Sequence, residues 1–480
     1  MNMPDLAPAY PEIFLLGMAC AILIVDLFVR PEKRIITYAL TQLTLLGAIG
    51  LTVAGMTGET TLAFNGGFIR DPMGDILKIF IYVVSFGVFL YGRDYLEARG
   101  LHKGEYYLLG LLAILGMAVL VSAHTLLNLY LGLEMLSLSL YALAAFNRDS
   151  GEASEAAMKY YVLGAIASGM LLYGMSLLYG LTGSLDIAQI AARINEALQV
   201  DGYRQTALVF SLAFVVAGLA FKLTLAPFHM WAPDVYQGAP TPVTLFISSA
   251  PKIAAFAMVM RLLVTGMGGL SAQWQDMLAA LAVLSIGIGN LVAIAQTNIK
   301  RMLAYSTVSH VGFIALGILA ATKVGYTSAM FYTLVYALTT LGAFGVILLL
   351  SRKGFEADQL SDFNGLNDRH PWIAFVMLLL LASMIGIPGT AGFVAKLSVL
   401  QSVVAIDKVG LAIYAVLLSV VGAYYYLRVM WYMYFEKPAS ELSINPSLDV
   451  NAALSINGLL MLLFGIFPGL LMALCVITLQ

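Results

Sequence analysis

The 480-residue sequence is too apolar for a protein that is surrounded by water. Hydrophobic residues make up 61% of it and charged residues 11%, whereas soluble domains carry roughly 25% charged residues. Most of the chain must therefore be solvated by lipid. The formal net charge of −2 gives no basic field for nucleic acid. The two cysteines, Cys20 and Cys475, lie far apart in apolar runs, which excludes a disulfide framework and a cysteine-based zinc or iron–sulfur site.

Apolar runs of membrane-spanning length predict an all-α polytopic protein with about fourteen transmembrane helices. A bilayer core of roughly 30 Å needs about 20 helical residues. The predicted spans lie near residues 11–29, 35–56, 73–92, 106–123, 125–147, 156–181, 206–232, 241–265, 276–297, 302–321, 327–350, 372–404, 409–435 and 453–478. No basic segment precedes the first run, so it is predicted to be an ordinary span and not a signal peptide.

Lys and Arg residues are unevenly distributed between alternate loops. Loops after odd-numbered spans hold thirteen, namely Arg30, Lys33, Arg34, Arg93, Arg99, Lys103, Arg148, Lys300, Arg301, Arg352, Lys353, Arg369 and Lys437. Loops after even-numbered spans hold five, namely Arg70, Arg193, Arg204, Lys323 and Lys408. Because cytoplasmic loops are enriched in Lys and Arg, the odd loops are predicted to be cytoplasmic and both termini to lie outside.

Three loop segments have recognisable patterns. Residues 60–72 alternate around Asn65-Gly66-Gly67, which predicts a hairpin. Residues 184–199 carry Leu and Ile at near-helical spacing, which predicts an amphipathic helix on the outer surface. The polar stretch 351–371 is predicted to be a cytoplasmic loop that contacts a neighbour.

Four ionisable residues lie deep inside predicted spans: Glu134, Lys222, Lys252 and Lys396. At 1.5 Å per residue, each lies on the order of 12–16 Å from a helix end, beyond the reach of a snorkelling side chain. An ionisable group at this depth costs several kcal/mol unless it is paired or hydrated, so it usually marks a transport pathway.

The remaining ionisable residues in the spans have less distinctive positions. Lys159 lies about one turn inside its helix, so it is either a snorkelling residue or part of the pathway. His310 is either a satisfied core residue or a proton relay. Lys78, Arg261 and Asp26 are interpreted as interfacial anchors.

Two predicted spans contain helix-breaking residues close to a buried lysine. The seventh span holds Pro227, Pro233, Pro240 and Pro242, and the twelfth holds Gly386, Pro388, Gly389 and Gly392. Proline removes a backbone hydrogen bond, and freed polar groups at membrane depth are tolerated only in protein or beside water. Two unrelated kinks would leave the same pattern, but the seventh and twelfth helices each stand fourth in a set of five.

This correspondence predicts two inverted five-helix repeats, helices 4–8 and 9–13, with broken helices 7 and 12. The predicted units are residues 1–105 for the first three helices, 106–265 and 266–435 for the repeats, and 436–480 for the last helix.

Three long blocks carry a family resemblance. PFHMWAPDVYQGAPTPVTLFISSAPKIA (227–254), QTNIKRMLAYSTVSHVGF (296–313) and GIPGTAGFVAKL (386–397) resemble the proton-translocating antiporter-like subunits of respiratory complex I, a NADH-quinone oxidoreductase. GAPTPVT followed by APKIA resembles the N-type rather than the L- or M-type members. The resemblance implies an ion pair of Glu134 and Lys222, a connecting Lys252 and a proton-exit Lys396. It also covers His229 and His310, with less defined roles.

The resemblance further implies that this chain binds no cofactor, and that NADH, FMN, iron–sulfur clusters and quinone belong to partner subunits. It implies L-, M-, K- and J-type membrane subunits as neighbours, and a location in a bacterial inner membrane with periplasmic termini. The implied function is proton translocation coupled to quinone reduction. A carboxylate near a buried lysine favours its protonated form, so Glu134 and Lys222 are expected to act as a switch.

Three other functions are compatible with parts of the sequence. A subunit of a multisubunit cation/proton antiporter or of a membrane-bound hydrogenase would share this fold. A membrane-embedded lipid transferase would need an acidic metal-binding cluster at a membrane face, and no such motif is visible. A passive scaffold would make the four buried charges individually dispensable.

Overall fold

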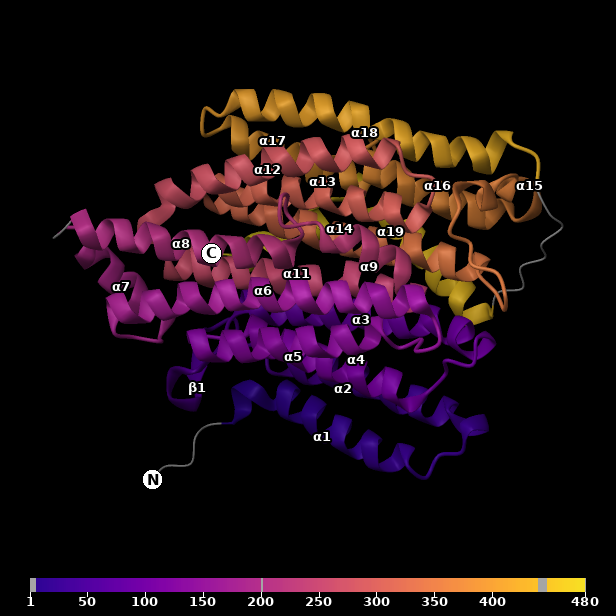
Figure 1. Cartoon of the computed structure of the whole chain (residues 1–480), viewed down its shortest axis with the longest axis horizontal. Helices are drawn as coiled ribbons and strands as arrows, with labels where there is room; N and C mark the ends of the chain where they lie inside the picture. The colour runs from indigo at the N-terminus through magenta and orange to yellow at the C-terminus, as the bar shows by residue number, and fades with distance from the viewer. Residues whose placement is uncertain (1–5, 200–201, 439–446, 480) are drawn as a thin grey trace.

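The structure is a computed structural model that describes residues 6–199, 202–438 and 447–479. Its long helices run side by side along one axis of the molecule (Figure 1). The first eight are α1 (Tyr10–Asp26), α2 (Ile35–Ala54), α3 (Pro72–Ala98), α4 (Gly104–Val121), α5 (Leu126–Ala144), α6 (Gly151–Thr182), α7 (Ile187–Ala197) and α8 (Gly202–Leu223). Apolar side chains along these helices meet in one continuous core.

The second part of the chain repeats this helical pattern. It contains α9 (Trp231–Gly238), α10 (Thr241–Ser248), α11 (Ala250–Val259), α12 (Ser271–Ile294), α13 (Ile299–Leu319), α14 (Lys323–Leu350), α15 (Leu366–Arg369), α16 (Pro371–Ile385), α17 (Ala391–Val404), α18 (Val409–Phe435), α19 (Leu448–Ile466) and α20 (Gly469–Thr478). Helices α10, α11, α13 and α14 form the buried centre of the bundle.

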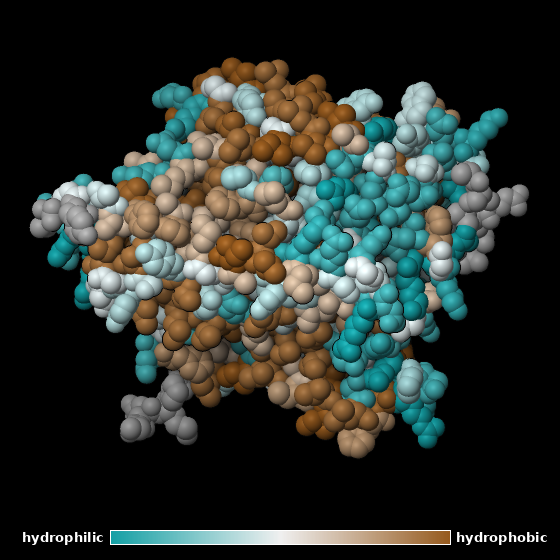
Figure 2. All heavy atoms as spheres, in the orientation of Figure 1, coloured by the Kyte–Doolittle hydropathy of each residue, from teal (hydrophilic) through white to brown (hydrophobic). Residues whose placement is uncertain are grey.

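The two ends of the bundle differ. The hairpin end carries β1 (Thr61–Ala63) and β2 (Phe68–Arg70), which pair antiparallel with Thr61 opposite Arg70, and the surface helix α7. These elements confirm the predicted hairpin and amphipathic helix. The loop end, at the right of Figure 1, carries residues 27–34, 99–103 and 351–370. Figure 2 shows hydrophilic residues gathered over this end, whereas much of the remaining face is apolar.

Within the described residues, thirteen helices are long and apolar enough to cross a membrane. The helices α16 and α17 are too short individually, but together they form one further broken span, which agrees with the predicted fourteen. The seventh span breaks between α8 and α9, and the twelfth breaks between α16 and α17, as predicted from their Pro and Gly residues. The two broken spans run in opposite directions (Figure 1). Opposite directions are what an inverted repeat requires. The residue limits of the two repeats stay a prediction.

Two further spans, predicted over 241–265 and 453–478, contain interruptions that were not predicted from the sequence. Ser249 has φ −113° and ψ −91° and separates α10 from α11, which restarts with Pro251 in its first turn. The Ser249 hydroxyl satisfies a freed carbonyl by donating to Leu245 O at 2.6 Å. A π-helical turn, Met260–Gly266, then extends α11. In the last span, Phe467 and Pro468 separate α19 from α20 because proline cannot continue the hydrogen-bond ladder.

Candidate functional site

Glu134 and Lys222 face a common space between α5, α6 and α8. Glu134 Oε1 accepts a hydrogen bond from the Ser168 hydroxyl on α6. The Lys222 ammonium donates to Ser137 Oγ on α5 at 2.8 Å, one turn after Glu134. Neither residue forms an ion pair within the described part of the chain. In this conformation each charged group is therefore held by a serine and not by the other.

A small cavity lies beside Lys222, among residues of α5, α6 and α8. It measures about 10 Å³, which is close to the space that one water molecule needs, and Ser137, Ser168 and Lys222 line it. A water molecule there would have hydroxyl and ammonium groups as partners. The cavity can thus connect the two polar groups without moving a helix.

Lys252 lies at the break of the seventh span. It occupies the first turn of α11, and its ammonium donates to the Thr224 hydroxyl and to the carbonyls of Lys222 at 3.4 Å and Leu223 at 3.3 Å. It also lies 5.3 Å from the centre of the Trp231 ring, where a cation is attracted by the ring face. Carbonyls that the break frees from the helix ladder therefore solvate this lysine.

Thr224 ends α8 in an unusual backbone conformation. Its φ of 78° lies in the left-handed region, which a β-branched residue rarely adopts. Thr224 N donates to Phe221 O and Leu225 N donates to Ala220 O, so the turn closes the helix as a glycine normally does. A threonine here adds the hydroxyl that accepts from Lys252.

Lys396 lies on α17, directly after the break of the twelfth span. Its ammonium donates to the freed carbonyl of Ile385 at 2.9 Å and to Ser419 Oγ on α18 at 2.6 Å. The Phe313 ring lies 5.2 Å from it. Gly386 turns the chain with φ 89°, and a side chain at that position would press on the Lys396 stem. The same chemistry therefore recurs at both breaks: a lysine, a freed carbonyl, a hydroxyl and an aromatic ring.

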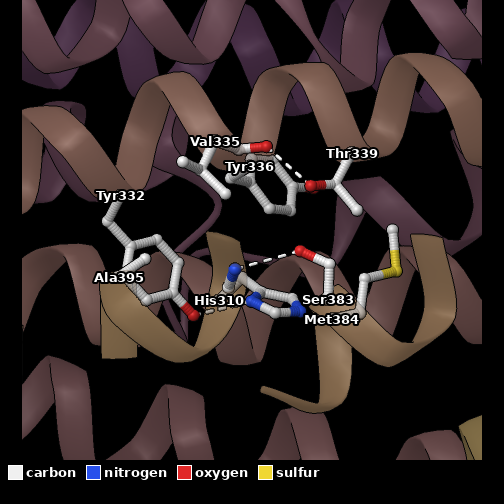
Figure 3. A pocket seen from close by; sticks show the side chains of 9 residues that line it. His310, Tyr332, Val335, Tyr336, Thr339, Ser383, Met384 and Ala395 are labelled. Atoms are coloured by element: carbon white, nitrogen blue, oxygen red, sulfur yellow. Dashed lines mark hydrogen bonds between the residues drawn. The ribbon is translucent and has the colours of Figure 1, made fainter. Parts of the chain in front are cut away.

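His310 lies between these sites on the buried helix α13. Its Nδ1 is 2.7 Å from the Tyr332 hydroxyl and its Nε2 is 3.0 Å from the Tyr426 hydroxyl (Figure 3 shows the Tyr332 side). A neutral imidazole has one donor and one acceptor nitrogen, and each tyrosine can serve either. A second cavity of about 10 Å³ adjoins His310, Tyr336 and Ser383. The arrangement allows a proton to enter the ring on one side and leave on the other.

The hydrogen bonds of these residues do not form a continuous chain. Within the described residues, no hydrogen bond joins Lys252 to His310 or His310 to Lys396. Transfer across these gaps requires water or side-chain rotation.

The structure places the other two predicted site residues outside this buried series. Lys159 is exposed on α6, where it pairs with Glu155 at 2.8 Å and with Asp234 at 2.7 Å. Arg301 also pairs with Asp234, so Lys159 belongs to a charged cluster at the surface. His229 lies in the turn between α8 and α9, with its ring centre 6.2 Å from that of Tyr305 on α13.

The residues interpreted as interfacial anchors are instead members of ion pairs. Lys78 is fully buried, and its ammonium lies 2.5 Å from Glu12 Oε1. Arg261 holds Asp71 through two hydrogen bonds of 2.6 and 2.8 Å. Their interpretation as anchors is wrong, because depth in a span does not reveal a partner on another helix. Asp26 lies near the end of its span, as expected, and it is half-buried there against Arg34.

Sequence reasoning missed the hydroxyl partners of the lysines, namely Ser137, Ser168, Thr224 and Ser419. Serine and threonine are common in membrane helices, where they usually bond to their own backbone, so their position in the sequence gives no signal. Tyr332 and Tyr426 were missed for a similar reason, since aromatic residues at helical spacing most often belong to the core. The prolines that follow Lys222 are the signal that could have directed attention to Thr224.

Comparisons with known proteins agree with this architecture. The family described as NADH:quinone oxidoreductase/Mrp antiporter, TM, matches residues 123–478. NADH-quinone oxidoreductase subunit N of Thioalkalivibrio sulfidiphilus is 60% identical over 473 residues, which are 98% of each chain. A chain of respiratory complex I from Thermus thermophilus is 32% identical with a TM-score of 0.83, covering 96% of this chain and 98% of that one.

A more distant solved structure shares the fold as well. A chain of the membrane-bound sulfane sulfur reductase, an archaeal respiratory membrane complex, is 27% identical with a TM-score of 0.86, covering 98% of this chain and 96% of that one. The same fold therefore occurs in more than one respiratory complex. The level of sequence identity distinguishes between them, because it is 60% to the subunit N relative and 27% to the reductase chain. By the full-length identity to its relatives, the chain belongs to the NADH-quinone oxidoreductase subunit N family.

Proposed function

We propose that this chain carries protons across a bacterial inner membrane through Glu134, Lys222, Lys252, His310 and Lys396. As a member of its family it is a membrane subunit of a proton-translocating NADH-quinone oxidoreductase. One observation supports the residue series: within the described chain, the three central lysines have neutral partners only. Hydroxyls and carbonyls stabilise an ammonium less than a carboxylate does, so these lysines can exchange protons.

Glu134 supplies the adjustable charge in this proposal. It now accepts from Ser168, and Ser168 and Lys222 line the same small cavity. When the carboxylate approaches Lys222 it favours the protonated ammonium, and when it turns back to Ser168 it favours release. Two unit charges at 4 Å attract by ~4 kcal/mol at an effective dielectric constant of about 20.

This interaction is large enough to move a proton against a membrane potential. Moving one charge through about 150 mV costs roughly 3.5 kcal/mol. The two quantities are comparable, so forming and breaking one Glu134–Lys222 contact can drive one transfer. A released proton would pass to Lys252, cross by way of His310 to Lys396, and leave at the hairpin end, toward which α17 runs.

In this proposal, the energy for proton movement comes from quinone reduction in partner subunits. NADH, FMN, iron–sulfur clusters and quinone are assigned to partner subunits, and L-, M-, K- and J-type subunits are assigned as neighbours. The hairpin end faces the periplasm and the loop end faces the cytoplasm, because the basic loops gather at the loop end.

A second candidate is a subunit of a multisubunit cation/proton antiporter or of a membrane-bound hydrogenase. The family description that matches residues 123–478 supports the antiporter, because it covers Mrp antiporters as well as NADH:quinone oxidoreductases. Sodium-dependent transport in vesicles without NADH would favour this candidate. Its absence, together with transport that requires NADH, would favour the oxidoreductase.

The test is Lys222→Ala in the assembled complex. NADH-driven quinone reduction and proton uptake are measured in the same inside-out membrane vesicles. We expect both to fall at least tenfold while the complex still assembles. Lys353→Ala, an exposed lysine in the loop after α14, is the matched control and should leave both rates unchanged. Normal pumping in the Lys222 variant would mean that Lys222 carries no proton and would favour a scaffold role for the chain.

A further inference from the structure

A large polar cavity lies at the loop end, away from the central lysines. Its volume is about 800 Å³, within the range of small-molecule sites. The turn between α1 and α2 forms one wall, and the end of α3 with the turn to α4 forms the other. Arg34 and Lys103 line it together with Glu32, Glu97 and Glu105. Arg93 and Asp94 line it as well, but they pair with each other, and Arg93 also pairs with Asp449. We infer that the cavity binds the headgroup of a phospholipid that carries both a phosphate and a primary ammonium, as phosphatidylethanolamine does.

The position of the cavity fits a lipid headgroup. α1 ends at Asp26, α2 begins at Ile35, α3 ends at Ala98 and α4 begins at Gly104, so four spans end beside it. This is the level at which the hydrocarbon core gives way to headgroups. Next to it, Leu27 is 76% exposed, Phe28 83% and Ile35 50%. An acyl chain can lie along these side chains while its headgroup enters the cavity.

The charges of the lining favour a headgroup with both signs. Glu32, Glu97 and Glu105 form no ion pair within the described residues, and neither does Lys103. Arg34 binds Asp26 through one terminal nitrogen, which leaves other N–H groups for a phosphate. A purely anionic headgroup would leave the three carboxylates without a cation.

His102 adds a polar contact without adding charge. Its Nε2 is buried and has no partner within the described protein. Burial lowers the pKa of this imidazole from its ordinary value, although nearby Glu97 acts in the opposite direction. The ring is therefore neutral near pH 7, and a small rotation that brings Nε2 to the cavity would let it accept a hydrogen bond from a ligand hydroxyl or ammonium.

The type of cation decides between common headgroups. A primary ammonium has three N–H donors for the three carboxylates, whereas the quaternary group of phosphatidylcholine has none. Phosphatidylglycerol has no cation. The expected order of binding is therefore phosphatidylethanolamine above both of the others.

Native mass spectrometry of the purified full chain tests this order. The chain is mixed with lipids that differ only in their headgroup, and the lipids that stay bound after release from detergent are counted. We expect phosphatidylethanolamine to be retained about fivefold better than phosphatidylcholine or phosphatidylglycerol, or ~1 kcal/mol at 1.4 kcal/mol per factor of ten. Glu97→Gln with Glu105→Gln should abolish the preference, and Asp149→Asn, an exposed acid at the same end, should keep it. Lys103→Gln should weaken all three lipids alike, because each of them carries a phosphate, and should keep the preference for phosphatidylethanolamine.

Two results would overturn the inference. Equal retention of the three lipids would mean that they surround the chain non-specifically. A preference that survives the double Glu variant in monodisperse protein would mean that the headgroup binds outside this cavity. A photo-reactive residue at position 35 in the assembled complex provides the second test. Capture of lipid supports the site, whereas capture of a protein segment shows that a partner subunit fills the cavity.

Discussion

Two kinds of buried lysine occur in this bundle, and their surroundings differ in one respect. Lys78 on α3 faces a carboxylate, with its ammonium 2.5 Å from Glu12 Oε1. Lys222, Lys252 and Lys396 face hydroxyls, carbonyls and, for two of them, aromatic rings. Lys78 lies in a continuous helix, whereas the other three lie at or beside helix breaks.

We propose that this difference separates a structural charge from an exchangeable one. A buried ion pair holds its proton, because deprotonation would leave an uncompensated carboxylate in a region that cannot solvate it. A lysine among neutral dipoles loses its proton without leaving an opposite charge behind. The breaks matter because they supply the carbonyls for this kind of solvation, which an intact helix keeps for itself.

The largest expected effect on stability comes from breaking the ion pair. Lys78→Met leaves Glu12 buried and unpaired, which should destabilise the folded chain by about 3–5 kcal/mol. Thermal unfolding of the purified chain and the amount of assembled complex measure this loss. The double variant Lys78→Met, Glu12→Gln should recover most of it, because no charge stays uncompensated. If the single variant is as stable as the original chain, the pair has no structural role.

Lys252→Met should give the opposite pattern. Its partners are the Thr224 hydroxyl and two carbonyls, so the loss of stability should stay near the 1–3 kcal/mol of unsatisfied neutral groups. Proton uptake coupled to NADH oxidation should fall at least tenfold. The measurement pairs vesicle uptake with unfolding of the same preparation. A variant that pumps normally would remove Lys252 from the exchangeable class.

The sequence predicted the depth of Lys222, Lys252 and Lys396 better than their surroundings, and their role in a proton pathway stays a proposal. Burial of a charge is costly enough to be noticed in one helix, and Pro388 or Pro227 marks a break because proline cannot donate. The break at Ser249 lacks such a marker at its own position. The left-handed turn at Thr224 lacks the glycine that usually marks one.

Partners on other helices are the least predictable part of the site. Glu12 and Lys78 lie far apart in the chain, and only the packing of α1 and α3 on the same neighbours, α2 and α4, brings them together. The same holds for Ser419 beside Lys396. A residue's depth can be estimated from its own helix, but its partner depends on tertiary structure.

Thr224 offers a smaller and more specific test. Thr224→Val keeps the shape but removes the acceptor for Lys252, whereas Thr224→Ser keeps the hydroxyl. Loss of one hydrogen bond to a charged group is worth about 1.5–3 kcal/mol. We expect the Val variant to pump severalfold more slowly and the Ser variant to pump near normally. Equal rates in both variants would show that the hydroxyl does not assist Lys252.

Ser137→Ala should have the smallest effect of the series. It removes the hydroxyl that accepts from Lys222 at 2.8 Å, but the adjoining cavity can admit a water molecule as a substitute. Proton uptake should fall by about two- to fivefold, with an unchanged ratio of protons to NADH. Ser139→Ala, on the same helix with its hydroxyl bonded to Met135 O, is the matched control. A drop as large as that of Lys222→Ala would mean that Ser137 is itself an obligatory member of the proton path, because replacement by water would then be insufficient.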